Sequence, residues 1–124
     1  MTIPNAERVA LGYLRDALDV PVFQIPPPSP PKRYVRLSRV GGGARNRVTD
    51  TAMLSISAYA DDPGDAADLA NAVREAMLAA RGSRIAGTWC RWWTEATGPA
   101  FYPDPDREDR YRYQFSGELR LAIR

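Results

Sequence analysis

A chain of 124 residues is long enough for one domain with one hydrophobic core, and we expect a single domain over residues 1–124. Its net charge of +2 is smaller than the basic excess typical of a protein that follows a nucleic-acid backbone. The chain has no histidine and a single cysteine, Cys90, which excludes an internal disulfide, a histidine-dependent zinc site and a Ser-His or Cys-His nucleophile. We therefore expect no enzyme, no metal and no cofactor.

The first sixteen residues, MTIPNAERVALGYLRD, contain acidic side chains and no long apolar run, which predicts neither a signal peptide nor a membrane span. A helix is predicted from about Asn5 to Leu18, because Asn5 can cap it and apolar residues recur at helical spacing. Pro21 prevents its continuation. Residues 20–25 are short and β-prone, and PPPSPP over residues 26–31 predicts a stiff polyproline II segment.

Two strands are predicted next, over residues 33–40 (RYVRLSRV) and from Thr51 to Ala60, joined by the loop GGGARNR. A second helix then has a clear start, because Asp62 can act as its cap and Pro63 suits its first position. An alanine-rich apolar stripe follows, and Gly82 ends the helix.

The last two strands are predicted over Thr88–Thr97 and Arg110–Arg124. Strict alternation places Trp92 in the core with Cys90, and it places Trp89 and Trp93 on the polar face, where exposed tryptophans indicate a partner surface. The alternative is that a loop covers these rings, or an arginine stacks on them, within one molecule. The final strand, about 40 Å long, exceeds what two helices are expected to cover and favours pairing across subunits.

Together these elements predict an α+β fold: a mainly antiparallel sheet of four to five strands, with two helices packed on one face. The sheet's other face is expected to be polar.

The glycine-rich loop comprises Gly41, Gly42, Gly43, Arg45, Asn46 and Arg47. It lacks the Lys-Ser/Thr ending of a phosphate-binding loop and the spaced glycines of a dinucleotide motif, and it leads into a strand rather than a helix. A mobile loop that contacts a phosphate backbone through charge alone is the better interpretation. The acidic stretch YPDPDREDR permits Mg²⁺ or Ca²⁺ ligation, but a turn rich in proline and aspartate is favoured.

Charge is divided between two segments of the chain. Lys32 to Arg47 contains six basic residues and no acid, whereas an acidic patch lies at Asp61, Asp62, Asp65 and Asp68. Opposite patches on one small domain suit self-association at least as well as nucleic-acid binding. We therefore predict a subunit interface that includes Trp89, Trp93, Arg36, Arg39, Asp61, Asp62 and Asp65.

The order of these motifs resembles the tail terminator proteins of siphovirus-type bacteriophages, particularly those of actinobacteria. The resemblance rests on RYVRLSRVGGGARNRVTDTAMLSISAYA, on the helix DAADLANAVREAML and on GPAFYPDPDREDRYRYQFSGELRLAIR, so it covers the chain from about Pro21 onward. Each motif alone is weak, and the order and the total length carry the similarity.

The resemblance implies an α+β subunit of a six-membered ring that caps the tail tube, ends tube polymerisation and offers the surface to which the filled head joins. The partners would be other copies of the chain, the tail tube protein and a head-closure or neck protein, with transient contact to passing DNA and none to a membrane. The location would be the tail–neck junction of the virion, and the host cytoplasm during assembly. A head-closure or adaptor protein of the same connector is the nearest alternative, and a small nucleic-acid-binding regulator is the alternative from another class.

Overall fold

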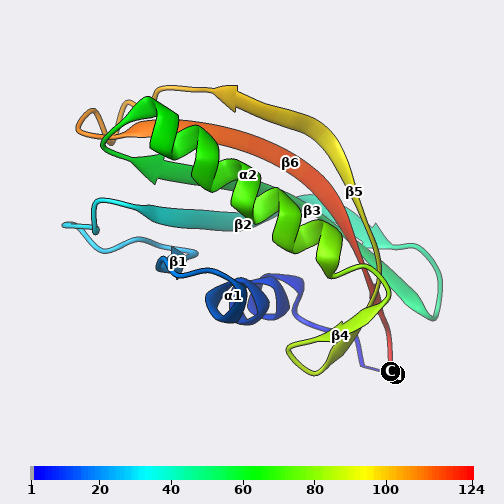
Figure 1. Cartoon of the computed structure of the whole chain (residues 1–124). Helices are drawn as coiled ribbons and strands as arrows, with labels where there is room; N and C mark the ends of the chain where they lie inside the picture. Colours follow the sequence, from blue (N-terminus) through cyan, green and yellow to red (C-terminus); the bar gives the residue numbers. More distant parts are fainter. Residues whose placement is uncertain (1) are drawn as a thin grey trace.

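The computed structural model describes residues 2–124 and contains two helices and a curved six-stranded sheet (Figure 1). In chain order the elements are α1 (Ala6–Ala17), β1 (Val22–Phe23), β2 (Tyr34–Ala44), β3 (Thr49–Ala60), α2 (Pro63–Ala79), β4 (Ser83–Ile85), β5 (Thr88–Phe101) and β6 (Tyr111–Ala122). The strands lie side by side in the order β1-β2-β3-β6-β5-β4. All neighbours are antiparallel except β1 and β2, which are parallel.

The predicted, mainly antiparallel sheet of four to five strands is therefore wrong, because the sheet has six strands and is mixed, although the α+β class agrees. The two strands that complete the sheet, β1 and β4, contain two and three residues. Segments this short carry no readable alternation, so their pairing depends on the tertiary structure. After β1, the proline-rich segment carries the chain back along the strand direction before β2 begins, so the two strands run in the same direction.

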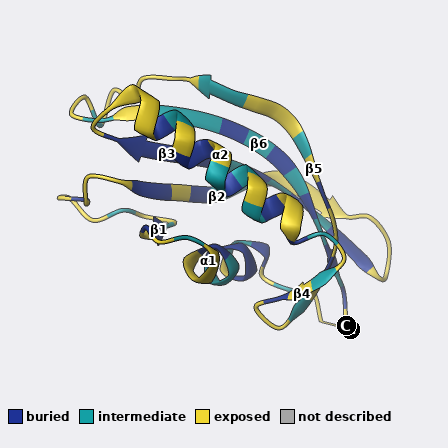
Figure 2. Cartoon of the chain, viewed as in Figure 1, coloured by how far each residue is buried: buried dark blue, intermediate teal, exposed yellow. Residues whose placement is uncertain are grey.

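Both helices pack on the same face of the sheet, which we call the inner face; the opposite face is the outer face (Figure 1). Asn5 and Asp62 cap the two helices, as the sequence predicted: their side chains accept hydrogen bonds from Arg8 N at 3.1 Å and Asp65 N at 3.0 Å. Figure 2 shows buried residues along the strands that lie beneath the helices. Neither helix in residues 2–124 is long and apolar enough to cross a membrane.

β6 lies in the middle of the sheet and pairs with β3 on one side and β5 on the other. The expectation that this long strand extends pairing across subunits is therefore wrong, because both of its edges are occupied within the molecule. Its 12 residues are matched by two neighbours of similar length, with 12 and 14 residues.

The predicted facing of the adjacent tryptophans is also wrong: Trp93 is fully buried and Trp92 is 45% exposed. A β-bulge explains the reversal, because Cys90 pairs with Leu121 and Trp92 pairs with Arg120, so Arg91 is an extra residue. One extra residue moves every following side chain to the opposite face. Trp93 therefore lies in the core, and it cannot belong to a surface of the folded subunit.

Candidate assembly surfaces

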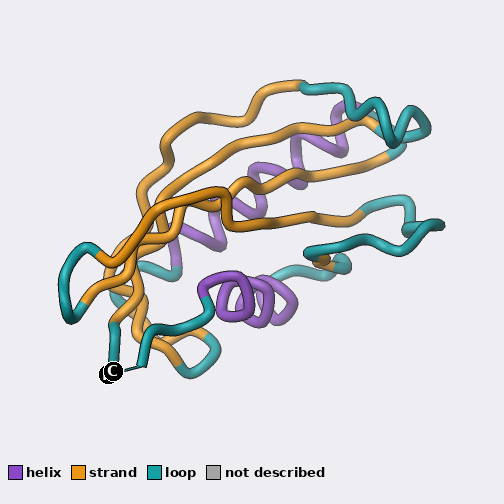
Figure 3. Tube along the Cα trace, turned by 180° about the vertical axis from the view of Figure 1, so that it is seen from behind, coloured by secondary structure: helices purple, strands orange, loops and turns teal. Residues whose placement is uncertain are grey.

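The β2–β3 hairpin projects from one end of the sheet (Figure 3), and all of residues 41–48 are exposed. The predicted loop is shorter than expected, because residues 41–44 continue β2 and pair with residues 50–53 of β3. Asn46 forms the turn itself: its side-chain oxygen accepts hydrogen bonds from Val48 N at 2.8 Å and Thr49 N at 3.0 Å. Arg45 and Arg47 are left exposed at the tip, and within residues 2–124 neither has a carboxylate within 4.0 Å.

Only one of the three glycines in this hairpin is required by the fold. A bulge lies between Arg39 and Gly41, and Gly42 has a φ of 86°, where a Cβ atom would collide with the carbonyl of Thr51. Neither Gly41 nor Gly43 has a positive φ, and a Cβ at either position would meet nothing within 4 Å.

Arg39, a predicted interface residue, is instead bound within the subunit. Its guanidinium donates to Asp50 at 3.0 Å and to the carbonyl of Gly41 at 3.0 Å, and its backbone N–H donates to Glu7 at 3.0 Å. The Asp50 side chain is only 4% exposed, so withdrawing Arg39 toward a partner would leave a buried carboxylate without its counter-charge, which is costly.

Two exposed tryptophans lie on β5, near the edge of the sheet. Trp89 is 42% exposed, as its alternation predicted, and Trp92 is exposed because of the bulge. The guanidinium of Arg81 lies 4.3 Å from the centre of the Trp92 ring, and its Nε donates to the backbone carbonyl of Trp93 at 2.8 Å. An arginine thus stacks on a tryptophan within the molecule, but on Trp92 rather than on Trp89 or Trp93, for which the sequence suggested it. This part of the β5 edge is already occupied.

The acidic patch lies at the other end of the sheet, where β3 leads into α2 (Figure 1). Asp61, Asp62, Asp65 and Asp68 are exposed, and within residues 2–124 none lies within 4.0 Å of a basic group. Asp62 has an internal role as the helix cap, so the other three are the carboxylates that remain available. The structure thus separates the acidic patch from Arg45 and Arg47 by the full length of β3.

On the outer face, the two proline-rich loops lie against each other, an arrangement that the sequence did not reveal. The loop before β2 is bound by arginines of the loop before β6: Arg107 donates to Pro28 O at 2.6 Å, and Arg110 donates to Pro30 O at 3.2 Å. We call these contacts, with the cluster beneath them described next, the loop clasp.

Beneath the loop clasp, Tyr34 and Tyr59 stack with ring centroids 4.5 Å apart, and Tyr59 donates a hydrogen bond to Asp104 at 2.8 Å. Burial, followed by the neighbouring Tyr59, raises the pKa of Tyr34 to about 12. Burial acts to raise the pKa of Asp104, but the hydrogen bonds from Tyr59 and Asp106 N and the charge of Arg112 outweigh it and lower that pKa. Asp104, considered as a metal ligand from sequence, is thus a structural carboxylate.

Beside the loop clasp, Arg36 remains exposed on the outer face and borders a polar hollow of about 170 Å³. No carboxylate of residues 2–124 lies within 4.0 Å of its guanidinium. Arg36 is therefore a surface cation, as an interface residue requires.

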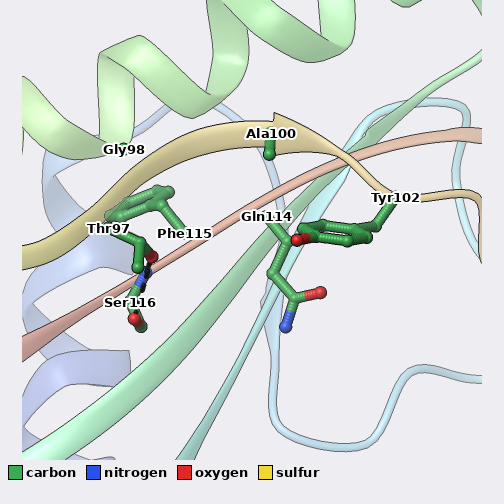
Figure 4. A pocket seen from close by; sticks show the side chains of 7 residues that line it. All are labelled: Thr97, Gly98, Ala100, Tyr102, Gln114, Phe115 and Ser116. Carbon is green, nitrogen blue, oxygen red and sulfur yellow. Dashed lines mark hydrogen bonds between the residues drawn. The ribbon is translucent and has the colours of Figure 1, made fainter.

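A second hollow, of about 300 Å³, lies where β5 and β6 separate at their irregular pairing (Figure 4). It is lined by Thr97, Gly98, Ala100, Tyr102, Gln114, Phe115 and Ser116. These residues include the hydroxyls of Thr97, Tyr102 and Ser116, but no carboxylate, thiol or basic side chain that could activate a hydroxyl. Elsewhere in residues 2–124, no three Asp, Glu or Cys side chains are grouped so that they could hold a metal ion. Cys90 is buried, and this burial raises the pKa of its thiol and so disfavours the nucleophilic thiolate.

No protein-family model matches the chain, and no curated protein sequence matches it. A similar fold occurs in a solved structure, the "Virion of native gene transfer agent (GTA) particle". The two chains superpose with a TM-score of 0.58 and 17% sequence identity, over 92% of this chain and 84% of the other. At this identity the similarity shows a shared fold.

Proposed function

We propose that the chain is a structural protein of a phage-like particle and forms a ring that caps the tail tube and joins it to the head. The observation that carries the proposal is the fold shared, over 92% of the chain, with a component of a gene transfer agent virion. The motif order that resembles tail terminators supports the same role, and the resemblance implies that the ring has six members. The proposed location is the tail–neck junction, and the proposed neighbours are the tail tube protein and a head-closure or neck protein.

The distribution of charge supports head-to-tail contact between copies. Unpaired arginines lie at one end of β3 and unpaired aspartates lie at the other end, so the two groups cannot meet within one molecule. Contact between unlike patches of neighbouring copies is heterologous, and it produces a ring where the rotation closes.

The exposed hairpin also supports contact with DNA. Arg45 and Arg47 can attract a passing phosphate backbone without reading its sequence. The same arginines favour a second candidate function, a small nucleic-acid-binding regulator, for which the free subunit would bind DNA with a steep dependence on salt.

The test is to produce particles that lack the chain and to measure their tails by electron microscopy. Overlong tail tubes without attached heads are expected. Tails of normal length joined to heads would overturn the terminator role, and heads with normal tails that fail to join would favour the head-closure alternative.

A further inference from the structure

Gly41 and Gly43 are not explained by the fold of the subunit itself. Neither has the positive φ that favours glycine, and a Cβ atom at either position would meet nothing within 4 Å. Glycine inside a strand weakens that strand, and it often marks a place where another backbone approaches closely. The subunit therefore carries two glycines whose absent side chains leave room for something outside it.

These glycines lie on an open edge of the sheet. β1 pairs only with Val35 and Arg36 of β2, and the N–H of Arg39 is bound by Glu7. Beyond that point, within residues 2–124, no strand covers the edge formed by Gly41 to Ala44. The other long edge of the sheet is more irregular, because β5 has three breaks in its pairing register and β2 has one. An arginine binds one carbonyl of each strand: Arg39 binds that of Gly41, and Arg81 binds that of Trp93.

The charge around this edge indicates what it receives. Arg45 and Arg47 follow it directly and have no acidic partner in the subunit, whereas Asp61 and Asp65 have no basic partner. β3 separates the two pairs by 12 residues, about 40 Å at the usual rise of a strand. A second copy can bring the acidic pair to the basic pair, and the first copy cannot.

We propose that the bare hairpin edge at Gly41 and Gly43 receives the segment that leads into α2 of a second copy, with Asp61 and Asp65 of that copy facing Arg45 and Arg47. The entering segment suits such an edge, because Asp62 is exposed and has an extended backbone (φ −135°, ψ 136°). This proposal rests on the proposed assembly into rings, and it identifies the two surfaces that meet between neighbouring subunits. It also explains why Gly41 and Gly43 have no side chain.

The first arm of the test enlarges the glycines, and light scattering over a concentration series, with electron microscopy, measures assembly. Gly41→Ala/Gly43→Ala should weaken association about tenfold, and Gly41→Val/Gly43→Val should weaken it further, while the thermal midpoint of the monomer stays equal or rises. Gly98→Ala is the matched control, because Gly98 is also exposed in a strand and a Cβ atom there would meet nothing within 4 Å. Unchanged assembly of the valine variant would overturn the contact.

The second arm exchanges the charges. R45E/R47E alone and D61R/D65R alone should each fail to assemble, and an equimolar mixture should recover assembly, because each copy then meets a complementary neighbour. A mixture that stays dissociated would overturn the pairing. Rings that persist in every variant would refute this contact but leave the proposed function intact, whereas a wild-type chain that forms no ring, alone or on tail tubes, would refute both. Loss of DNA binding without loss of self-association would assign the hairpin to DNA and overturn the contact.

Discussion

The indole ring of Trp93 lies directly over Gly117, so a methyl group at position 117 would overlap two ring atoms and approach the carbonyl oxygen of Thr94 at 2.7 Å. The bulge at Arg91 turns Trp93 toward the core, and Gly117 provides the space for it. This pair joins β5 to β6 beneath α2.

Gly117→Ala should therefore lower the free energy of unfolding by about 1–3 kcal/mol, because a filled core cannot admit the extra methyl without displacing the ring. Urea unfolding measures the loss. Gly98→Ala, with open space around it, should have almost no effect, and equal stability of the two variants would contradict the packing of Trp93 on Gly117.

The two adjacent tryptophans should differ sharply when truncated. Trp93→Ala removes a fully buried ring and should cost about 3–5 kcal/mol. Trp92→Ala removes an exposed ring stacked on Arg81 and should cost about 1 kcal/mol or less. Chemical denaturation followed by circular dichroism gives both values. A larger loss for Trp92 would contradict the structure and support the arrangement that strict alternation predicts, with Trp92 in the core and Trp93 exposed.

The loop clasp should make stability depend on the ionisation of Asp104. Asp104→Asn should lower the free energy of unfolding by about 1–3 kcal/mol at pH 7, because the carboxylate accepts from Tyr59 and from Asp106 N. The lowered pKa of Asp104 means that its contribution is present above the unfolded pKa of about 3.9 and is lost as the pH falls below it. The free energies of unfolding of wild type and Asp104→Asn should converge in acid. Asp106→Asn, at an exposed carboxylate, should be as stable as wild type both at pH 7 and in acid.

Tyr34 should produce a loss of stability in alkali. Its pKa is raised to about 12 in the folded chain, while an unfolded tyrosine ionises near pH 10. The unfolded state therefore loses its proton first, and stability falls as the pH rises from about 10 to 12. Tyr34→Phe keeps the stack on Tyr59 and should unfold less steeply over this range in thermal melts; an identical pH profile would exclude Tyr34 as the cause.

The tip of the hairpin should be required for the function of the particle but not for the stability of the subunit. Arg45→Glu/Arg47→Glu should leave the thermal midpoint of the subunit within a few degrees of wild type, because both side chains are exposed and unpaired. The same variant should reduce infectivity or DNA delivery of the particle by interrupting ring assembly, head joining or DNA passage. Unchanged infectivity would remove the hairpin tip from the proposed function.

The features that could be predicted from the sequence are those encoded by neighbouring residues. Asn5 and Asp62 cap the two helices as expected, since a cap is formed within three residues of the chain. The alternation of β6 also predicts its buried and polar faces. These signals are local, so they can be recognised in the sequence without knowledge of the tertiary structure.

The features that the sequence did not reveal depend on distant partners. β1 and β4 are strands only because β2 and β5 lie beside them. The bulge at Arg91 is a mismatch between two strands, and neither strand shows it alone. Of the predicted interface residues, Arg39 is paired with Asp50 and Trp93 is buried in the core. Arg36, Trp89 and the aspartates remain on the surface.

The most direct test of assembly into rings is negative-stain electron microscopy of the purified chain at high concentration, with its mass measured by light scattering. We expect rings with an open centre and six-fold symmetry, formed in solution or on the ends of added tail tubes. A chain that remains monomeric at every concentration and also leaves tail tubes uncapped would contradict the proposed function.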